Sequence, residues 1–227
     1  MNNGINDYAR IRSFINSFNK NDENEILADI YFSAKDMKVP VIREDMKELI
    51  RLLLLINKPK KILEIGTAVG YSASFMVDVL KKDVSIDTLE LDRERILIAK
   101  ENIKRLEFED NINIIEGDAE ESLKELSKSD INIYDMIFID AAKGQYMIYL
   151  DEALKMSKPG TIIISDNILE DGKIIESHFL VEKREITIHD RIRQYLYRLK
   201  NDERLATDIL SVGDGAAVSL VIKKFDI

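Results

Sequence analysis

Short apolar runs alternate regularly with amphipathic segments through the middle of the chain. The five runs are Lys61–Ile65, Val84–Leu89, Ile112–Ile115, Tyr134–Ile139 and Thr161–Ser165, and between them lie Ser72–Lys81, Arg93–Leu106, Glu120–Leu126 and Gln145–Met156. Apolar runs of this length, separated by segments of helical length, are typical of buried parallel strands. The alternation therefore predicts a doubly wound α/β sheet.

The two ends of the chain depart from this alternation. Before it, apolar residues spaced three and four apart predict helices over Ile5–Phe18, Glu25–Lys38 and Glu44–Ile56. After it, Thr207–Val212 and Ala216–Lys223 flank the turn Gly213-Asp214-Gly215, which predicts a terminal antiparallel hairpin and seven strands in all. We predict one domain, 1–227, with N-terminal helices in 1–58 and the α/β core in 59–227.

Composition excludes several classes of protein. The 227 residues are 45% apolar and include no cysteine, which excludes disulfides, thiolate metal sites and cysteine nucleophiles. The polar start, MNNGINDYAR, and the lack of a long apolar stretch predict a cytoplasmic protein without a membrane segment. The net charge of −9 argues against nonspecific nucleic-acid binding through overall charge but is compatible with a local basic patch.

The end of the first predicted strand reads ILEIGTAVGYS, from Ile62 to Ser72. Gly66 and Gly70 lie in the turn, where a missing Cβ lets a ligand approach the backbone at the binding edge of such a sheet. Their spacing is GxxxG and not GxGxxG, which disfavours a dinucleotide site. Glu90, 20 residues after Gly70, suits a ribose diol because a carboxylate accepts from both hydroxyls. The alternative is a tight turn and a solvated acid; together the features favour a nucleoside-containing ligand.

Polar residues also follow the fourth and fifth predicted strands. Asp140 and Lys143 lie in YDMIFIDAAKGQY, and Asp166 and Asn167 lie in GTIIISDNIL. These strands are expected to be neighbours, so two carboxylates and an amide converge at one edge of the sheet. Such oxygen donors suit a hard cation, above all Mg²⁺. The alternative is that the two aspartates cap helices and Asn167 closes a turn; the combination favours the metal.

Taken in order, these motifs resemble those of class I S-adenosylmethionine-dependent methyltransferases. The similarity runs from about Val39 to the C-terminus through EIGTAVGYS, LELD, EGDAEE, FIDAAKGQY, SDNIL and VGDGAAVSL. It is to the cation-dependent O-methyltransferases, which include the catechol and caffeoyl-CoA enzymes. MKVPVI and the segment from Val181 to Gly215 resemble in particular the bacterial enzymes that convert 5-hydroxyuridine at the tRNA wobble position (position 34) to 5-methoxyuridine. The resemblance implies a Rossmann-like fold and a homodimer.

The resemblance also implies a cofactor site for S-adenosylmethionine. Val39 would contact the methionine part, Ser72 its carboxylate and Glu90 the ribose, while Glu64 would stiffen the turn. Asp118, between Gly117 and Ala119, would accept from the adenine amino group. The full implied set is Met37, Val39, Glu64, Gly66, Ser72, Glu90, Gly117, Asp118, Ala119 and Asp140.

The implied catalytic centre overlaps this set. Asp140 would serve both the cofactor ammonium and a Mg²⁺ or Mn²⁺ ion, whose other ligands would be Asp166 and Asn167. Lys143 would assist as a base or by its charge. Tyr146 and Tyr149 would either line the substrate mouth or pack within a helix.

Substrate choice is expected to depend on residues outside this core. From Val181 to Lys200 there are six Lys or Arg residues against three acids, and Arg184, Arg191 and Arg198 recur every seven residues. Such a stripe would follow the phosphates of a tRNA anticodon loop, although charge alone favours a merely solvated helix face. Three functions stay open: a tRNA methyltransferase, a small-molecule methyltransferase for catechol-like substrates, and a catalytically silent tRNA- or partner-binding protein. The intact acidic cluster with Lys143 counts against the third.

Overall fold

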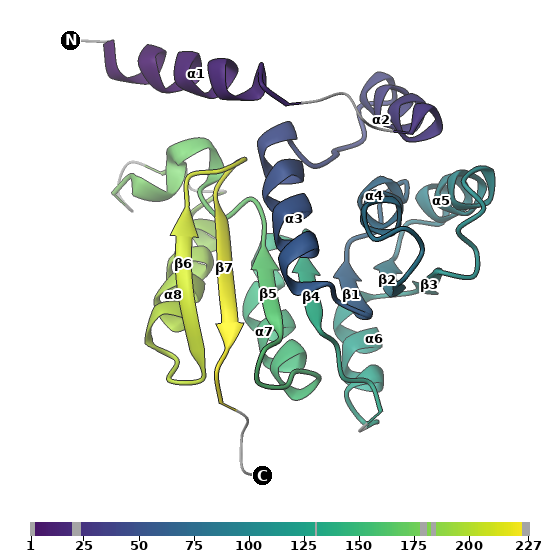
Figure 1. The fold of residues 1–227 in the computed structure, drawn as a ribbon. Helices are drawn as coiled ribbons and strands as arrows, with labels where there is room; N and C mark the ends of the chain where they lie inside the picture. Colours follow the sequence, from purple (N-terminus) through teal and green to yellow (C-terminus); the bar gives the residue numbers. More distant parts are fainter. Residues whose placement is uncertain (1–2, 20–23, 130, 178–180, 183–184, 224–227) are drawn as a thin grey trace.

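The computed structural model describes residues 3–19, 24–129, 131–177, 181–182 and 185–223, and it contains one seven-stranded sheet (Figure 1). The strand order is β3-β2-β1-β4-β5-β7-β6. The parallel strands are β1 (Lys61–Ile65), β2 (Ser85–Glu90), β3 (Ile112–Glu116), β4 (Met136–Ile139) and β5 (Ile162–Ser165). The hairpin of β6 (Leu205–Leu210) and β7 (Ala216–Val221) adds antiparallel to β5. The predicted Rossmann-like fold with a terminal hairpin is confirmed.

Helices cover both faces of the sheet. One face packs against α2 (Glu25–Asp36), α3 (Glu44–Asn57), α4 (Tyr71–Val79) and α5 (Arg93–Arg105), and the other against α6 (Ala119–Leu126), α7 (Tyr146–Lys155) and α8 (Ile186–Asn201). Two 3₁₀ helices, η1 (Lys143–Gln145) and η2 (Glu170–Ile175), follow β4 and β5. Helix α1 (Asn3–Asn16) lies across the end of the molecule toward which β4 and β5 point (Figure 1).

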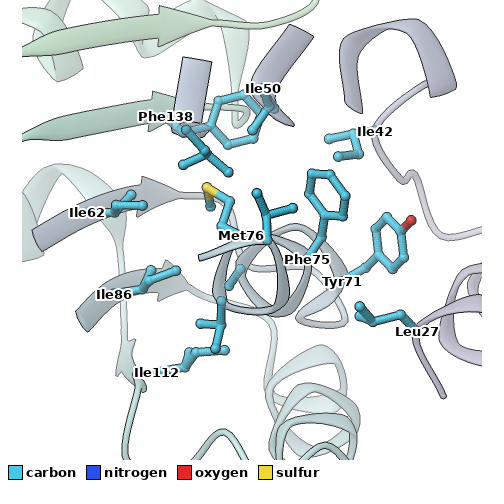
Figure 2. Packing of buried hydrophobic residues seen from close by; sticks show 14 of the residues in the cluster. Leu27, Ile42, Ile50, Ile62, Tyr71, Phe75, Met76, Ile86, Ile112 and Phe138 are labelled. Atoms are coloured by element: carbon cyan, nitrogen blue, oxygen red, sulfur yellow. The ribbon is translucent and has the colours of Figure 1, made fainter. Parts of the chain in front are cut away.

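Two separate apolar cores follow from the alternation of side chains along each strand. In β1, Ile62 belongs to the core under α2–α5, whereas Leu63 belongs to the core under α6–α8. Figure 2 shows the first core around α4, whose Phe75 and Met76 pack between the sheet and the N-terminal helices. Because both faces are covered, the central strands β4 and β5 are buried on both sides, which explains why they read as continuous apolar runs.

The observed elements differ from the predicted ones mainly at their ends. Strand β6 ends at Leu210 and not at Val212, because the Val212 carbonyl accepts from Gly215 N at 2.8 Å and already belongs to the turn. Helix α1 spans Asn3–Asn16, two residues before the predicted range. Of the helices in the described ranges, none is long and apolar enough to cross a membrane.

Candidate active site

A cavity of about 430 Å³ opens at the carboxyl ends of β1, β2 and β4. It lies where the strand order reverses, between β1 and β4, which is the usual ligand position in an open α/β sheet. Its lining includes much of the predicted site: Gly66, Ser72, Glu90, Gly117, Asp118, Ala119, Asp140 and Asn167. The fold thus brings the turn after β1, Glu90, Asp140 and Asn167 to one cavity, whereas Lys143 and Asp166 lie next to it and are not part of its lining.

The turn after β1 requires glycine at position 66. Gly66 has a φ of +107°, and a Cβ there would lie 2.1 Å from the Asp140 carbonyl oxygen. The end of β1 therefore packs directly against the end of β4. Gly70, with a φ of +80°, is the N-cap of α4 and offers no side chain to the first N–H groups of the helix. The helix start beside Ser72 suits an anionic group such as a carboxylate.

Glu90 organises the loop at the end of β2. Its Oε1 accepts from the backbone N–H groups of Leu91 and Asp92, both at 2.9 Å, and its Oε2 accepts from Ala68 N at 2.8 Å. A carboxylate has about four acceptor positions. One position on Oε2 is therefore left for a ligand hydroxyl.

Asp118 both caps helix α6 and lines the cavity. Its Oδ1 caps α6 by accepting from Glu120 N at 2.9 Å and Glu121 N at 3.2 Å. Gly117, with a φ of +144°, precedes it and lines the same part of the cavity. The cap fixes the position of the Asp118 carboxylate at the cavity wall.

Glu64 lies behind the cavity and is fully buried. Thr88 Oγ1 donates to its Oε2 at 2.5 Å, and the hydrogen bonds of Ser72 and Thr88 act to lower the pKa of Glu64. Burial, with a smaller contribution from the nearby carboxylates of Asp140 and Glu90, raises the pKa of Glu64 to about 7. Glu64 is not part of the cavity lining, and its predicted role in stiffening the turn stays a prediction.

The acidic cluster lies at the ends of β4 and β5. Asn167 Nδ2 donates to Asp140 Oδ1 at 2.8 Å, and Asp166 is only 3% exposed. Burial raises the pKa of both aspartates, and burial together with the charge of Asp140 raises that of Asp166 to about 7. The residues that cap η1 and η2 are Ala142 and Leu169, so neither aspartate caps the helix after it.

These residues fit a hard divalent cation. Two carboxylates held close together in a buried site favour a positive charge between them. Asn167 is held at a φ of +60°, which a non-glycine residue rarely adopts, and a half-turn of its amide would present an oxygen in place of the nitrogen. In the described ranges no three acidic or histidine side chains form a metal site by themselves; a cation held here would take the Asn167 amide oxygen as a third protein ligand.

Lys143 lies beside this cluster at the start of η1. Its Nζ is 3.9 Å from the Asp214 carboxylate, in the turn of the terminal hairpin. The next residue, Gly144, accepts a hydrogen bond from Arg191 Nη1 at 3.0 Å. Tyr146 is buried and donates to the Asp166 carbonyl at 3.0 Å. Tyr146 therefore packs behind the site, whereas Tyr149 lines the cavity.

Several predicted residues lie elsewhere. Met37 is 48% exposed at the end of α2, and neither it nor Val39 lines the cavity. Arg198 pairs with Asp202 at 3.0 Å and lies 3.5 Å from Asp151. Arg184 lies outside the described residues. Pro40, Val41 and Ile42 line the cavity in place of Met37 and Val39.

Comparison with known proteins identifies the family. The model of the O-methyltransferase family matches residues 19–224. The chain belongs to this family. It is 38% identical to catechol O-methyltransferase of Niastella koreensis over 57% of this chain and 58% of that protein. It is 30% identical to caffeoyl-CoA O-methyltransferase of Populus kitakamiensis over 83% and 80% of the two chains. The fold matches an O-methyltransferase from Bacillus cereus in complex with SAH, with a TM-score of 0.81, 26% identity, and coverage of 93% and 97%.

This O-methyltransferase is thus of the caffeoyl-CoA and catechol type. Its cavity also contains residues that the sequence analysis does not single out. Arg95 and Gln145 line it from α5 and η1. Arg95 follows Glu90 by five residues, and no spacing rule marks its side chain as facing the cavity.

Proposed function

We propose that this O-methyltransferase transfers the methyl group of S-adenosylmethionine to 5-hydroxyuridine at the wobble position of tRNA. The proposal rests first on the continuity of the cavity, which runs from Glu90 to Asp140 and Asn167. Glu90, a carboxylate suited to a ribose hydroxyl, and two members of the acidic cluster, Asp140 and Asn167, line the same space. Such a cavity suits a nucleoside cofactor at one end and an oxygen nucleophile at the other.

The cofactor end is supplied by the loops after β1, β2 and β3. Glu90 would accept from a ribose hydroxyl, and the start of α4 with Ser72 would hold the carboxylate. Asp118 would accept from the adenine amino group. S-adenosylmethionine supplies, when bound, a methyl group on a positively charged sulfur. The task of the protein is to align the acceptor oxygen with that methyl group.

The acceptor end is supplied by β4, β5 and η1. Asp140, Asp166 and Asn167 would hold a Mg²⁺ or Mn²⁺ ion, which stabilises an ionised acceptor hydroxyl. Lys143 lies beside this cluster and would take the hydroxyl proton or favour the oxyanion by its charge. In 5-hydroxyuridine, the 5-hydroxyl and the 4-carbonyl are adjacent oxygens, which suits chelation by one cation.

Arg191 supports an RNA acceptor. It is exposed and donates to Gly144, the residue after Lys143, so a cationic side chain stands at the site. Such a residue suits a backbone phosphate of a nucleotide whose base enters the cavity. The second candidate function is methylation of a small catechol-like molecule. It is favoured by the names of the relatives from Niastella and Populus.

Transfer of labelled methyl groups onto three acceptors separates the two candidates. We expect 5-hydroxyuridine-containing tRNA to react at least tenfold faster, in kcat/KM, than free 5-hydroxyuridine and a simple catechol. Arg191→Ala should weaken tRNA binding a few-fold and reduce its salt dependence, because one phosphate contact is lost. Arg105→Ala, on the surface of α5, is the control. A catechol methylated as efficiently as the tRNA would select the small-molecule function.

The homodimer implied by the sequence resemblance stays a prediction. A groove of about 630 Å³ between α3 and the hairpin is lined by Leu53, Val218 and Leu220, among others, and Leu52 and Ile56 of α3 are 56% and 69% exposed. A second copy would remove such side chains from water. Sedimentation equilibrium of the protein and of Ile56→Glu measures this association.

A further inference from the structure

The hairpin turn 213–215 is wedged between the acidic cluster and the N-terminal helices. On one side, the carbonyls of Asp214 and Gly215 accept from Leu169 N at 2.8 Å and Ile168 N at 3.0 Å, directly after the acidic cluster. The fit is close, because a Cβ on Gly215 would lie 2.1 Å from Leu169 Cγ. A Cβ on Gly213 would lie 3.5 Å from Asp166 Oδ1. The position of this turn thus affects the surroundings of Asp166.

On its other side, the turn is held by Asp45 and Arg12. Asp45 Oδ2 accepts from Gly213 N at 2.9 Å and from Arg12 Nε at 2.6 Å. A second nitrogen of Arg12, Nη2, donates to the Gly213 carbonyl. Arg43 Nη1 also approaches this carbonyl, at 3.4 Å. Both polar groups of the Gly213 backbone are therefore bound by side chains from the start of the chain.

The turn carries Asp214, whose side chain is only 9% exposed and lies 3.9 Å from Lys143 Nζ. A chain of contacts therefore connects α1 to Lys143 through Asp45, Gly213 and Asp214. The residues that it joins lie up to 202 positions apart in the sequence, between Arg12 and Asp214. An ion pair such as Arg12–Asp45, whose side chains are 29% and 16% exposed, contributes little to overall stability. Because both side chains also bind the Gly213 backbone, the pair is well placed to fix the position of the turn.

We propose that Arg12 and Asp45 are positioning residues for methyl transfer. They hold the turn 213–215 so that the Asp214 carboxylate orients the Lys143 ammonium group toward the acceptor. Helix α1 thereby acts on the active site, although none of its residues whose side chains the structure describes lines the cavity. The proposal rests on the role of Lys143 in the proposed function, and it predicts effects on turnover that depend on Asp214.

A double-mutant cycle measures this dependence. Arg12→Ala and Asp214→Asn should each lower kcat about tenfold or more, with the dissociation constant of S-adenosylmethionine changed less than twofold. The double variant should be no slower than Asp214→Asn alone, because Arg12 acts through Asp214. Asp45→Asn, which keeps an acceptor for Gly213 N, should be impaired less than Asp45→Ala. Arg105→Ala, which breaks a surface pair with Asp29 at 2.5 Å, is the matched control and should leave kcat unchanged.

Amide hydrogen exchange tests the same contacts without turnover. Arg12→Ala should speed exchange at least tenfold at Gly213, Gly215 and Leu169, and leave the loop at Gly117 unchanged. Unchanged exchange at the turn, or rate losses in the double variant that multiply, would overturn the positioning role. If the wild-type protein methylates neither tRNA nor a catechol, the proposed function fails, and the exchange result alone then decides whether Arg12 holds the turn.

Discussion

The two ends of the cavity are built in different ways. At the proposed cofactor end, Gly66 directly follows β1, Glu90 is the last residue of β2, and Asp118 lies two residues after β3. Backbone N–H groups occupy most of the acceptor positions of Glu90. At the acceptor end, Lys143 and Asp166 depend on side chains from distant segments, including Asp214 and Tyr146.

The difference concerns which end is complete before a ligand binds. The cofactor end is fixed by local backbone contacts and by close packing such as that of Gly66 against Asp140. The acceptor end contains two carboxylates whose pKa values are raised by burial, and a bound cation would lower them. We therefore expect variants at the two ends to fail in different steps of the reaction.

The largest effect is expected at the acceptor end. Asp166→Asn removes one of the two carboxylates that would bind the cation. It should lower kcat about 10³-fold, equivalent to about 4 kcal/mol of transition-state stabilisation. The dissociation constant of S-adenosylmethionine, measured by calorimetry, should change less than threefold. If the variant loses cofactor binding to the same extent as turnover, the claim that the two ends serve different steps of the reaction is wrong.

A smaller effect, on cofactor binding and not on turnover, is expected at Glu90. Glu90→Ala removes the charged acceptor for the ribose and loosens the loop that it holds through Leu91 and Asp92. It should weaken S-adenosylmethionine binding by about 2–4 kcal/mol, with kcat at saturating cofactor much less affected. Calorimetry on a folded variant measures the affinity, and Glu94→Ala, on the exposed start of α5, is the control. Unchanged affinity would remove Glu90 from the cofactor site.

The third effect concerns stability and pH at the base of the cavity. In the cofactor-free protein Glu64 keeps its proton up to a pH of about 7, whereas in the unfolded chain it ionises near 4.5. The folded state therefore binds more protons between these pH values, and the free energy of unfolding falls as pH rises through this window. The difference between the two pKa values corresponds to roughly 3 kcal/mol.

Glu64→Gln removes this dependence. The free energy of unfolding, measured with urea at pH 5 and pH 8, should therefore fall more for the wild type than for the variant. Other groups such as Asp166 titrate in both proteins, so the difference between the two isolates Glu64. An equal fall in both would mean that Glu64 is already ionised in the folded protein at pH 5.

The same contrast explains what the sequence predicted. The sequence predicted the parallel strands and several cavity-lining residues, because each motif lies within a few residues of a strand end, as Gly66 and Glu90 do. The sheet with its terminal hairpin was confirmed. The ends of β6 and α1 were less accurate, because turn hydrogen bonds such as Gly215 N to Val212 decide where elements stop.

The contacts around Lys143 were beyond a sequence argument. Arg12, Asp45 and Asp214 meet only through the tertiary fold, and nothing in their local sequence marks them as partners. Arg95 enters the cavity lining from α5 for the same reason. The seven-residue spacing of the arginines predicted one continuous basic stripe. Arg191 instead donates to Gly144, next to Lys143, whereas Arg198 is paired with Asp202 and Asp151.

Removal of divalent cations tests the distinction between the two ends most directly. Calorimetric titration with S-adenosylmethionine and methyl transfer to the accepted substrate are measured on the same sample, first with EDTA and then with excess Mg²⁺ or Mn²⁺. We predict a cofactor dissociation constant that differs less than threefold between the two conditions, and transfer that falls about 10³-fold in EDTA and returns with the cation. Undiminished transfer in metal-free buffer, or loss of cofactor binding together with transfer, would contradict the account.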